Sequence, residues 1–428
     1  ATLRRGFRRS AGPGGSRTQT VDPDGGAMTP VTRGAMTIET VRSAVGLFAL
    51  KREWTELLRD SDADGLFLTW EWLATWWKHL ANGRPLSVLV VRRGGAVEAI
   101  APLLIRPAGW SSALPFPSLG FLGTGSVGSD YLDMIVRRGR EARALGALAE
   151  ALSSQKLMLE VGQVRREGSS VGRLAGILEQ RGWTVERETS HLSRFINLRN
   201  LTWDSYLAGL GREHRYNFRR RLRTLERAHA MRFEAVRAET GRREALHRII
   251  DLHNRRWQER GGSNAFHTER HLAFHEEVSR LACERGWLRL FLLHLDGRPA
   301  AGLYGFRYGD TFYFYQSGFD PALARLSAGM VTMGLAIKSA LEEGAGEYDL
   351  LQGAERYKEL WARDSRDLTR FEIYPPQSRG AVYRRAVELS RAAKRAVRRV
   401  LTKKLADRLA SRCAGTAAEG GRFDPVAG

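Results

Sequence analysis

The first half of the chain alternates hydrophobic and polar positions in a regular succession of elements. Apolar residues recur at every second position in the segments expected to be strands, and at every third or fourth position in the expected helices. Gly94 and Gly95 separate two apolar stretches, which predicts a hairpin. The expected elements are strand 37–45, helices 48–58 and 70–80, strands 86–91 and 97–105, strand 131–136, helix 141–152, strand 157–161, helix 171–180 and strand 183–198.

The second half repeats this order after an arginine-rich stretch. Turns at Asp296-Gly297 and Gly309-Asp310 join three strands into an antiparallel meander, and a helix follows. The pattern predicts an α+β fold of two tandem domains, each with a mixed, mostly antiparallel sheet flanked by helices. The expected elements are strand 231–236, helices 242–259 and 269–284, strands 287–295, 299–308 and 311–317, helix 327–343, strand 347–351, a short helix 357–361 and strand 368–374.

These patterns divide the chain into six segments. Residues 37–198 and 231–375 are the expected N- and C-terminal domains, and an arginine-rich helical segment, 199–230, connects them. Tails at 1–36 and 413–428 are expected to be disordered, the first being rich in Gly, Ser, Thr, Pro and Arg. Residues 376–412 predict a basic amphipathic helix with Val382, Ala386 and Leu389 on its apolar face. Docking on the body is the favoured interpretation, and a membrane-surface helix is the alternative.

The positive charge is concentrated outside the expected domains. The 428 residues include 68 Lys+Arg and 47 Asp+Glu, a formal net charge of +21. Residues 212–227 contain seven Arg and two Glu, and residues 379–412 contain twelve Lys or Arg with one Glu and one Asp. The run from Arg212 to Arg227 and the basic C-terminal helix could therefore bind tRNA or an anionic membrane surface. Solvated helix faces are the alternative.

Several classes of protein are excluded by the cysteine count and the apolar runs. Cys283 and Cys413 are too few for a disulfide scaffold or a four-cysteine zinc module, and they favour a reducing compartment. The longest apolar runs, 86–91 and 99–105, are shorter than the ~18 residues of a membrane-spanning helix. No apolar segment of a secretory signal follows the N-terminal arginines. We therefore expect a cytoplasmic protein without a transmembrane segment, at most peripheral at the inner membrane surface.

Two short motifs suggest chemistry that their surroundings do not support. His267, His271 and His275 are spaced by four, but no carboxylate or cysteine constellation completes a metal site. A histidine stripe on a helix face and no metal are therefore expected. Residues 123–128 match G-x-G-x-x-G, yet a strand pattern rather than a helix follows them. An ordinary loop is expected there, or a loop that reaches an active site between the domains.

A series of segments in a fixed order carries a family resemblance. They are FLTWEW at 67–72, RYNFRRRLR at 215–223, AAGLYGFRYG at 300–309, YFYQSGFD at 313–320, SAG at 327–329, YDLLQG at 348–353 and YKxxW at 357–361. This series resembles the CelD-like (BioF-like) acyltransferases of the GNAT N-acyltransferase superfamily, which are related to the Fem peptidoglycan aminoacyltransferases. The resemblance covers about residues 48–374 and implies two tandem GNAT-like domains.

The resemblance also implies a reaction. It implies acyl transfer to an amine or hydroxyl group, with acetyl-CoA or another acyl-CoA as donor and no metal. Some members of the family accompany exopolysaccharide or cellulose biosynthesis, which implies a carbohydrate or cell-envelope precursor as acceptor. Fem relatives use aminoacyl-tRNA as the donor, so an aminoacyl-tRNA-dependent ligase is one alternative. A catalytically silent scaffold of the same fold is the other.

The helix start that follows the meander is the expected donor site. In the resembling fold, this N-terminus offers free backbone N–H groups to a pyrophosphate. Ser327 can cap the helix, Gly329 between Ala328 and Met330 lets a ligand approach the backbone, and Arg325 adds positive charge. A routine strand-to-helix turn is the alternative.

The strands beside that helix supply the candidate catalytic residues. Gln316 lies on the strand before the helix, where the acyl thioester is expected. Asp349 on the next strand is a candidate general base or acceptor-orienting carboxylate. Tyr348 and Asp349 could equally be one buried residue and one helix-cap partner. Tyr304 could hydrogen-bond the substrate or fill the core.

Four further residues are candidates for acceptor binding. Tyr357 and Lys358 could hold an acceptor phosphate or carboxylate, as the resemblance suggests, although Lys358 could equally be a surface lysine. Trp70 and Trp72 could form the floor of a sugar site between the domains. Tryptophans on an amphipathic helix belong more often to the core, which is the alternative for this pair.

Overall fold

The computed structural model describes residues 36–108, 116–125, 127–258, 261–353, 355–376, 380–390 and 392–393. Apart from Met36, the two expected tails lie outside the described residues. Most of the expected basic helix 376–412 lies outside them as well. Residues 380–390 of that segment are helical.

The described start of the basic segment docks on the body of the protein. Tyr383 and Val387 are buried in a cluster with Met158 and Tyr374. Tyr383 stacks on Phe116, with 3.9 Å between the ring centroids. Val382 and Leu389, two of the residues expected on the apolar face, are instead exposed. The docked face is therefore rotated from the predicted one, because the Tyr383 ring anchors it.

The N-terminal half contains a four-stranded antiparallel sheet in the order β1-β2-β3-β6 and contributes further strands to a second sheet. Its elements are β1 (Met36–Val41), α1 (Ala44–Ala49), α2 (Lys51–Arg59), the 3-10 helix η1 (Leu66–Leu68), α3 (Trp70–Leu80), β2 (Val88–Arg93), β3 (Ala96–Ala101), β4 (Leu103–Arg106), β5 (Ser118–Phe121), β6 (Ile135–Val136), α4 (Glu141–Gln155), β7 (Met158–Arg165), α5 (Ser170–Gln180) and β8 (Thr184–Asn197).

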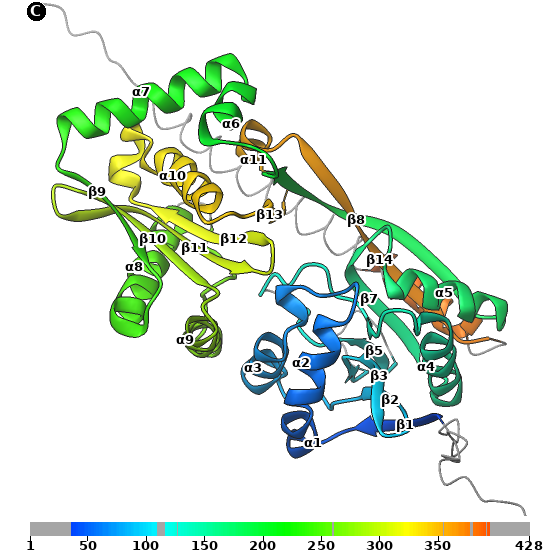
Figure 1. Cartoon of the computed structure of the whole chain (residues 1–428). Helices are drawn as coiled ribbons and strands as arrows, with labels where there is room; N and C mark the ends of the chain where they lie inside the picture. Colours follow the sequence, from blue (N-terminus) through cyan, green and yellow to red (C-terminus); the bar gives the residue numbers. More distant parts are fainter. Residues whose placement is uncertain are drawn as a thin grey trace, which may run out of the picture.

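The C-terminal half contains the expected meander with helices on both of its faces (Figure 1). Its elements are α6 (Trp203–Gly209), α7 (Arg212–Ala228), β9 (Met231–Val236), α8 (Glu239–Gln258), α9 (Glu269–Glu284), β10 (Leu288–Leu295), β11 (Arg298–Tyr308), β12 (Thr311–Phe319), the 3-10 helix η2 (Pro321–Leu326), α10 (Ala328–Glu342), β13 (Glu347–Gln352), α11 (Arg356–Trp361) and β14 (Asp364–Tyr374).

Alternation along the meander strands places α8 and α10 on opposite faces of the sheet. On β10, Leu290 and Leu292 pack in one core cluster with Ile249 of α8. Phe291, the residue between them, packs in a second cluster with Ile337 of α10. Successive side chains of a strand point to opposite faces, so each helix buries one set of them. This arrangement confirms the expected α+β class.

A ten-stranded sheet passes through both halves of the molecule. Its order is β4-β5-β7-β14-β8-β13-β12-β11-β10-β9. The long strands β8 and β14 lie side by side and lead from one half to the other (Figure 1). The sequence pattern places strand 368–374 in the sheet of the second half. That expectation is wrong, because β14 lies between β7 and β8 of the first half. Periodicity identifies a strand but not its partner.

Helix α3 also joins the two halves. The indole ring of Trp72 makes edge contacts with Phe274 of α9 and Phe306 of β11, at centroid distances of 5.2 and 5.8 Å. Glu71, beside it, accepts hydrogen bonds from Arg285, the shorter at 2.6 Å. The halves therefore share both a sheet and a core. Within the described part of the chain, every helix is too short or too polar to span a bilayer.

The shared sheet predicts that the N-terminal half does not fold alone. In a fragment of residues 36–198, β8 loses both of its partners, β13 and β14, and β7 loses β14. We expect this fragment to show no cooperative thermal unfolding in near-ultraviolet circular dichroism. Appending residues 362–376 through a flexible linker should restore it, and a scrambled version of that segment should not. Cooperative unfolding of fragment 36–198 alone would contradict the prediction.

Candidate active site

The strands β12 and β13 pair only at their beginnings and then separate. Their parallel register covers Thr311 to Tyr313 against Glu347 to Asp349. Beyond this point lies a cavity of about 220 Å³, which we call the α10 cavity. The end of β12, the first turns of α10 and the helix α11 line it. The segment predicted as the donor site therefore faces an open cavity.

The first backbone amides of α10 have no hydrogen-bond acceptor. Ser327 adopts a left-handed conformation with φ of 58°, and its side chain does not cap the helix. The expectation that the Ser327 hydroxyl caps the helix is therefore wrong. The backbone carbonyl of Ser327 instead accepts hydrogen bonds from the N–H groups of Met330 and Val331. Among the described residues, the N–H groups of Ala328 and Gly329 find no acceptor. Two unpaired N–H groups at a helix start favour an anion.

The predicted donor residues are distributed unevenly around the cavity. Ser327, Ala328, Gly329 and Met330 all line it. The exposed side chain of Arg325 does not, and its carbonyl accepts a hydrogen bond of 3.1 Å from Arg221 of α7. The positive charge at this cavity thus comes from a residue that the sequence analysis missed.

That residue is Arg256, which comes from α8. It lines the cavity, lies 5.1 Å from the ring of Phe319 and donates a hydrogen bond of 3.3 Å to the hydroxyl of Ser317. His214 of α7 also lines the cavity and packs edge-on against Trp361 at 4.4 Å. Its Nε2 atom is buried and has no partner among the residues that the structure describes, and burial lowers the pKa of the His214 imidazole. Both residues belong to helices far away in sequence, and no local motif marks them.

The predicted catalytic residues do not line the α10 cavity. Gln316 is half-buried on β12 and pairs in register with Tyr304 on β11. Tyr304 is fully buried, and its hydroxyl has no partner among the described residues. Its surroundings are those of a core residue, which was the stated alternative.

Asp349 is fully buried in a polar cluster where the two strands separate. Its carboxylate accepts hydrogen bonds from the Tyr131 hydroxyl at 2.7 Å, the Ser193 hydroxyl at 3.2 Å and the Leu351 N–H at 2.7 Å. Tyr131 comes from the N-terminal half, so this cluster joins the halves.

The Tyr-Lys pair is separated by the structure. Tyr357 lines the α10 cavity. Lys358 is buried, donates to the carbonyl of Gln352 at 2.7 Å and pairs with Glu355 at 3.0 Å. A buried ammonium with these partners ties β13 to α11. This placement agrees neither with an acceptor-binding lysine nor with a surface lysine.

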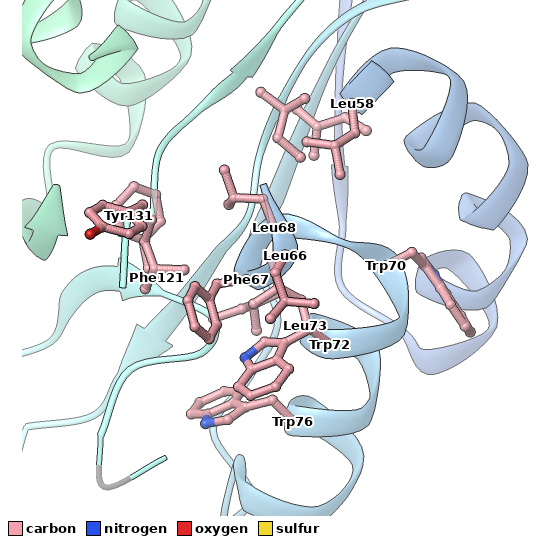
Figure 2. Packing of buried hydrophobic residues seen from close by; sticks show 14 of the residues in the cluster. Leu58, Leu66, Phe67, Leu68, Trp70, Trp72, Leu73, Trp76, Phe121 and Tyr131 are labelled. Carbon is pink, nitrogen blue, oxygen red and sulfur yellow. The ribbon is translucent and has the colours of Figure 1, made fainter. Parts of the chain in front are cut away.

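The two candidate sugar-site tryptophans belong to the core. Trp70 and Trp72 are 8% and 1% exposed. Their indole N–H groups donate to the Leu47 carbonyl and to the Ser129 hydroxyl, at 3.1 and 2.9 Å. Figure 2 shows Trp72 beside Trp76 among buried apolar side chains. The apolar face of α3 packs in the core, where Trp72 contacts the C-terminal half. Neither ring is therefore exposed enough to stack on a sugar.

The expected histidine stripe has one buried member. His275 is fully buried, and burial lowers its pKa to about 3. The rings of His267 and His271 lie 4.5 Å apart near the surface. No group of three or more His, Cys, Asp or Glu side chains in the described part of the chain is arranged to hold a metal ion.

Comparison with known proteins assigns the C-terminal half. Residues 212–359 match the family model of the acetyltransferase (GNAT) domain. This range begins with α7 and includes all residues that line the α10 cavity except Leu360 and Trp361. The C-terminal half therefore carries an acyltransferase domain of the GNAT superfamily. None of the curated proteins compared with the chain matches it.

Solved structures share the fold of three quarters or more of this chain. The crystal structure of FemX covers 75% of this chain and 95% of its own, with a TM-score of 0.54 and 14% identity. A conserved protein of unknown function from Bacteroides thetaiotaomicron covers 79% of this chain and all of its own, with a TM-score of 0.51 and 12% identity. At such identities the likeness concerns the fold alone.

Proposed function

We propose that the protein is an acyl-CoA-dependent N- or O-acyltransferase whose donor enters the α10 cavity. The acceptor in this proposal is a carbohydrate or cell-envelope precursor, with a link to exopolysaccharide or cellulose biosynthesis. The nature of the acceptor rests on the CelD-like resemblance of the sequence. The place of the donor rests on one observation, the two unpaired N–H groups of Ala328 and Gly329 at the cavity wall.

The residues present at the cavity fit a donor with phosphates and a thioester arm. The Ala328 and Gly329 N–H groups can donate to a phosphate, and the guanidinium of Arg256 adds positive charge. Phe314, Met333 and other apolar side chains line the remainder. The volume of about 220 Å³ is below the roughly 300–1,000 Å³ of pockets that enclose a whole ligand, so the cavity suits one end of a long donor. An acyl-CoA supplies an activated acyl group for attack by an amine or hydroxyl.

The chain's own contribution to that attack would be positioning and proton removal. Asp349 remains our proposal for the group that takes up the proton. Its Oδ2 atom accepts a hydrogen bond from Tyr131 Oη, which connects it to the interface between the halves. Burial of this cluster excludes water, which strengthens its electrostatic interactions.

A second candidate function is supported by the surface of α7. Arg212, Arg219, Arg220, Arg223 and Arg227 are exposed and form no ion pair with any described residue. His214 of the same helix lines the α10 cavity. A polyanion on α7 would thus lie next to the cavity, as an aminoacyl-tRNA-dependent ligase requires.

Calorimetry separates the two candidates. We expect acetyl-CoA to bind, and acetyl-pantetheine, which lacks the phosphates, to bind at least about tenfold more weakly. Equal affinity for the two compounds would reject the amide site as the phosphate site. Binding of tRNA without binding of acetyl-CoA would favour the ligase. In that case the affinity should fall with salt with a logarithmic slope of roughly 0.7 to 0.9 per neutralised phosphate. If neither ligand binds, a catalytically silent scaffold is favoured.

A further inference from the structure

A second cavity lies between the two halves, outside the donor site. It has a volume of about 250 Å³, and we call it the interhalf cavity. The loop Asp62 to Phe67, the segment Asp130–Tyr131 and the start of α5 line it from the N-terminal half. Tyr313 of β12 lines it from the C-terminal half. Its size suits a small molecule or one ring of a larger one.

Asp130 is the buried acid of this cavity. Its side chain is fully buried, and its Oδ2 atom accepts a hydrogen bond of 2.7 Å from the backbone N–H of Gln352. Its Oδ1 atom is buried and has no hydrogen-bond partner in the part of the chain that the structure describes. An unpaired buried carboxylate oxygen costs free energy unless a donor meets it. The cavity is the open space beside it from which such a donor can come.

The neighbouring carboxylates are already satisfied or solvated. Asp133 accepts three backbone N–H groups, including those of Ser170 and Val171 at the start of α5. Asp64 accepts a hydrogen bond of 2.6 Å from Tyr308, and Asp62 pairs with Arg138 at 2.9 Å. Glu167 is exposed. Asp130 is thus the acid of this cavity with a buried oxygen, Oδ1, that no donor among the described residues meets.

The backbone around Asp130 is strained. Tyr131, Gln163 and Leu351 have positive φ angles of 59°, 57° and 57°, although none is glycine. Hydrogen bonds hold them together: the carbonyl of Gln163 accepts from Leu132, and the N–H of Leu351 donates to Asp349. Residues other than glycine adopt this conformation at a cost of about 1–3 kcal/mol each, and such residues cluster at ligand sites. Of these three residues Tyr131 lines the cavity, directly after Asp130.

The interhalf cavity lies across the sheet from the α10 cavity. Phe314 lines the α10 cavity and Tyr313, its neighbour on β12, lines the interhalf cavity. Neighbouring strand residues point to opposite faces, so the two cavities approach β12 from its two sides. Asp130 is bonded to the end of β13, just beyond the point where β12 and β13 separate.

We propose that the interhalf cavity binds the acceptor as a small primary amine, with its ammonium group on the Asp130 carboxylate. An ammonium ion supplies both the missing donor and the compensating charge, whereas a hydroxyl supplies only the donor. The aromatic ring of Tyr313 is a favourable neighbour for a cation, whereas the guanidinium of Arg165 already lies 4.6 Å from the ring of Tyr131. This inference rests on the proposed function, because the bound amine is an acceptor only if the protein transfers an acyl group. It specifies an amine rather than a hydroxyl as the acceptor.

The charges around Asp130 make the binding dependent on pH. Burial raises its pKa to about 7, and the charge of Asp349 adds to this, while the Gln352 N–H and the charge of Lys358 oppose it. Only the ionised carboxylate attracts an ammonium ion, so affinity should fall about tenfold per pH unit below the pKa of about 7. The other titratable or charged groups that line the cavity around it are Asp62, Asp64, Tyr131, Asp133, Arg165, Glu167, Arg173 and Tyr313.

The test uses pairs of probes that differ in one group. Cyclohexylamine with cyclohexanol, and glucosamine with glucose, are titrated into the full chain and followed by ligand-observed NMR. We expect the amine of at least one pair to bind at least about tenfold more tightly than its neutral partner. Asp130→Asn should remove this preference, since an amide still accepts from Gln352 but carries no charge. Asp62→Asn removes a carboxylate of the same cavity that already has an ion-pair partner. This variant should change the preference for the amine by less than about twofold.

Acetyl-CoA binding distinguishes a failure of the amine site from a failure of the proposed donor site. Asp130→Asn should bind acetyl-CoA as the unmodified chain does, which also shows that the variant is folded. An amine preference that persists in Asp130→Asn, or that is absent for both pairs, overturns the amine site even if acetyl-CoA binds. An amine preference that depends on Asp130 upholds the site even if acetyl-CoA does not bind, and the donor assignment alone is then wrong.

Discussion

Replacing Gly329 by glutamate should abolish measurable acetyl-CoA binding, with a loss of at least about 100-fold in affinity, or roughly 2.7 kcal/mol. Gly329 lines the α10 cavity and presents one of the two unpaired N–H groups. A Cβ atom there would already lie 3.3 Å from the ring of Phe319, so a longer side chain must extend into the cavity. Its carboxylate would then face the phosphates that the amides are proposed to bind. Calorimetry measures the loss.

The control for this variant is Ala322→Glu. Ala322 is exposed in η2, the same connection between β12 and α10, and it does not line the cavity. The substitution adds the same charge a few residues away, so it reports the long-range electrostatic effect alone, which salt screens. We expect less than about a threefold change in affinity for Ala322→Glu. Unchanged affinity in Gly329→Glu would show that the donor phosphates bind elsewhere.

Local periodicity predicted the elements that surround the donor site. The helix expected at 269–284 is α9, and the strand and helix expected at 311–317 and 327–343 are β12 and α10 within two residues at each end. In this half, turns and apolar spacing agree with each other, and the meander pairs strands that are neighbours in sequence. The position of the α10 cavity followed from that agreement.

The same reasoning failed where strands pair over long distances. The stretch 97–105 was expected to be one strand but is two, β3 and β4, which belong to different sheets. Pro102 separates them, since it has no N–H to donate to a ladder. In the expected strand 131–136 only Ile135 and Val136 pair, because Asp133 and Asp130 bond backbone N–H groups elsewhere. These partners are remote in sequence, so periodicity carries no sign of them.

The second cavity illustrates the limit for candidate sites. Asp130 and Tyr131 directly follow the glycine-rich loop at 123–128, for which an active-site loop was one interpretation. The strand pattern that follows this motif left an ordinary loop as the other interpretation. What marks Asp130 is the absence of a partner for its Oδ1 atom and the open space beside it. Both properties arise only when β12 and β13 are assembled with the N-terminal half, so they cannot be read from spacing.

Gly318→Ala should destabilise the fold by more than the roughly 1–3 kcal/mol of ordinary overpacking. Gly318 lies on β12 where α8 crosses it, and an added Cβ would lie 2.2 Å from the backbone nitrogen of His253 and 2.4 Å from the carbonyl carbon of Leu252. These are backbone atoms of a helix, so the whole of α8 must shift to admit a methyl group. Thermal unfolding followed by circular dichroism measures the loss.

The matched control makes the same chemical change with the opposite expected sign. In α5, an added Cβ at Gly176 would meet no atom within 4 Å. Because alanine is the better helix former, Gly176→Ala should stabilise the protein by about 0.5–1 kcal/mol.

The shift of α8 in Gly318→Ala would also break the hydrogen bond of 3.0 Å from His253 Nδ1 to the Ser317 carbonyl and displace Arg256 from the α10 cavity. Acetyl-CoA affinity should therefore fall in Gly318→Ala even below its melting temperature, whereas Gly176→Ala should retain it. A stable Gly318→Ala variant with full affinity would mean that α8 does not hold the wall of the donor cavity.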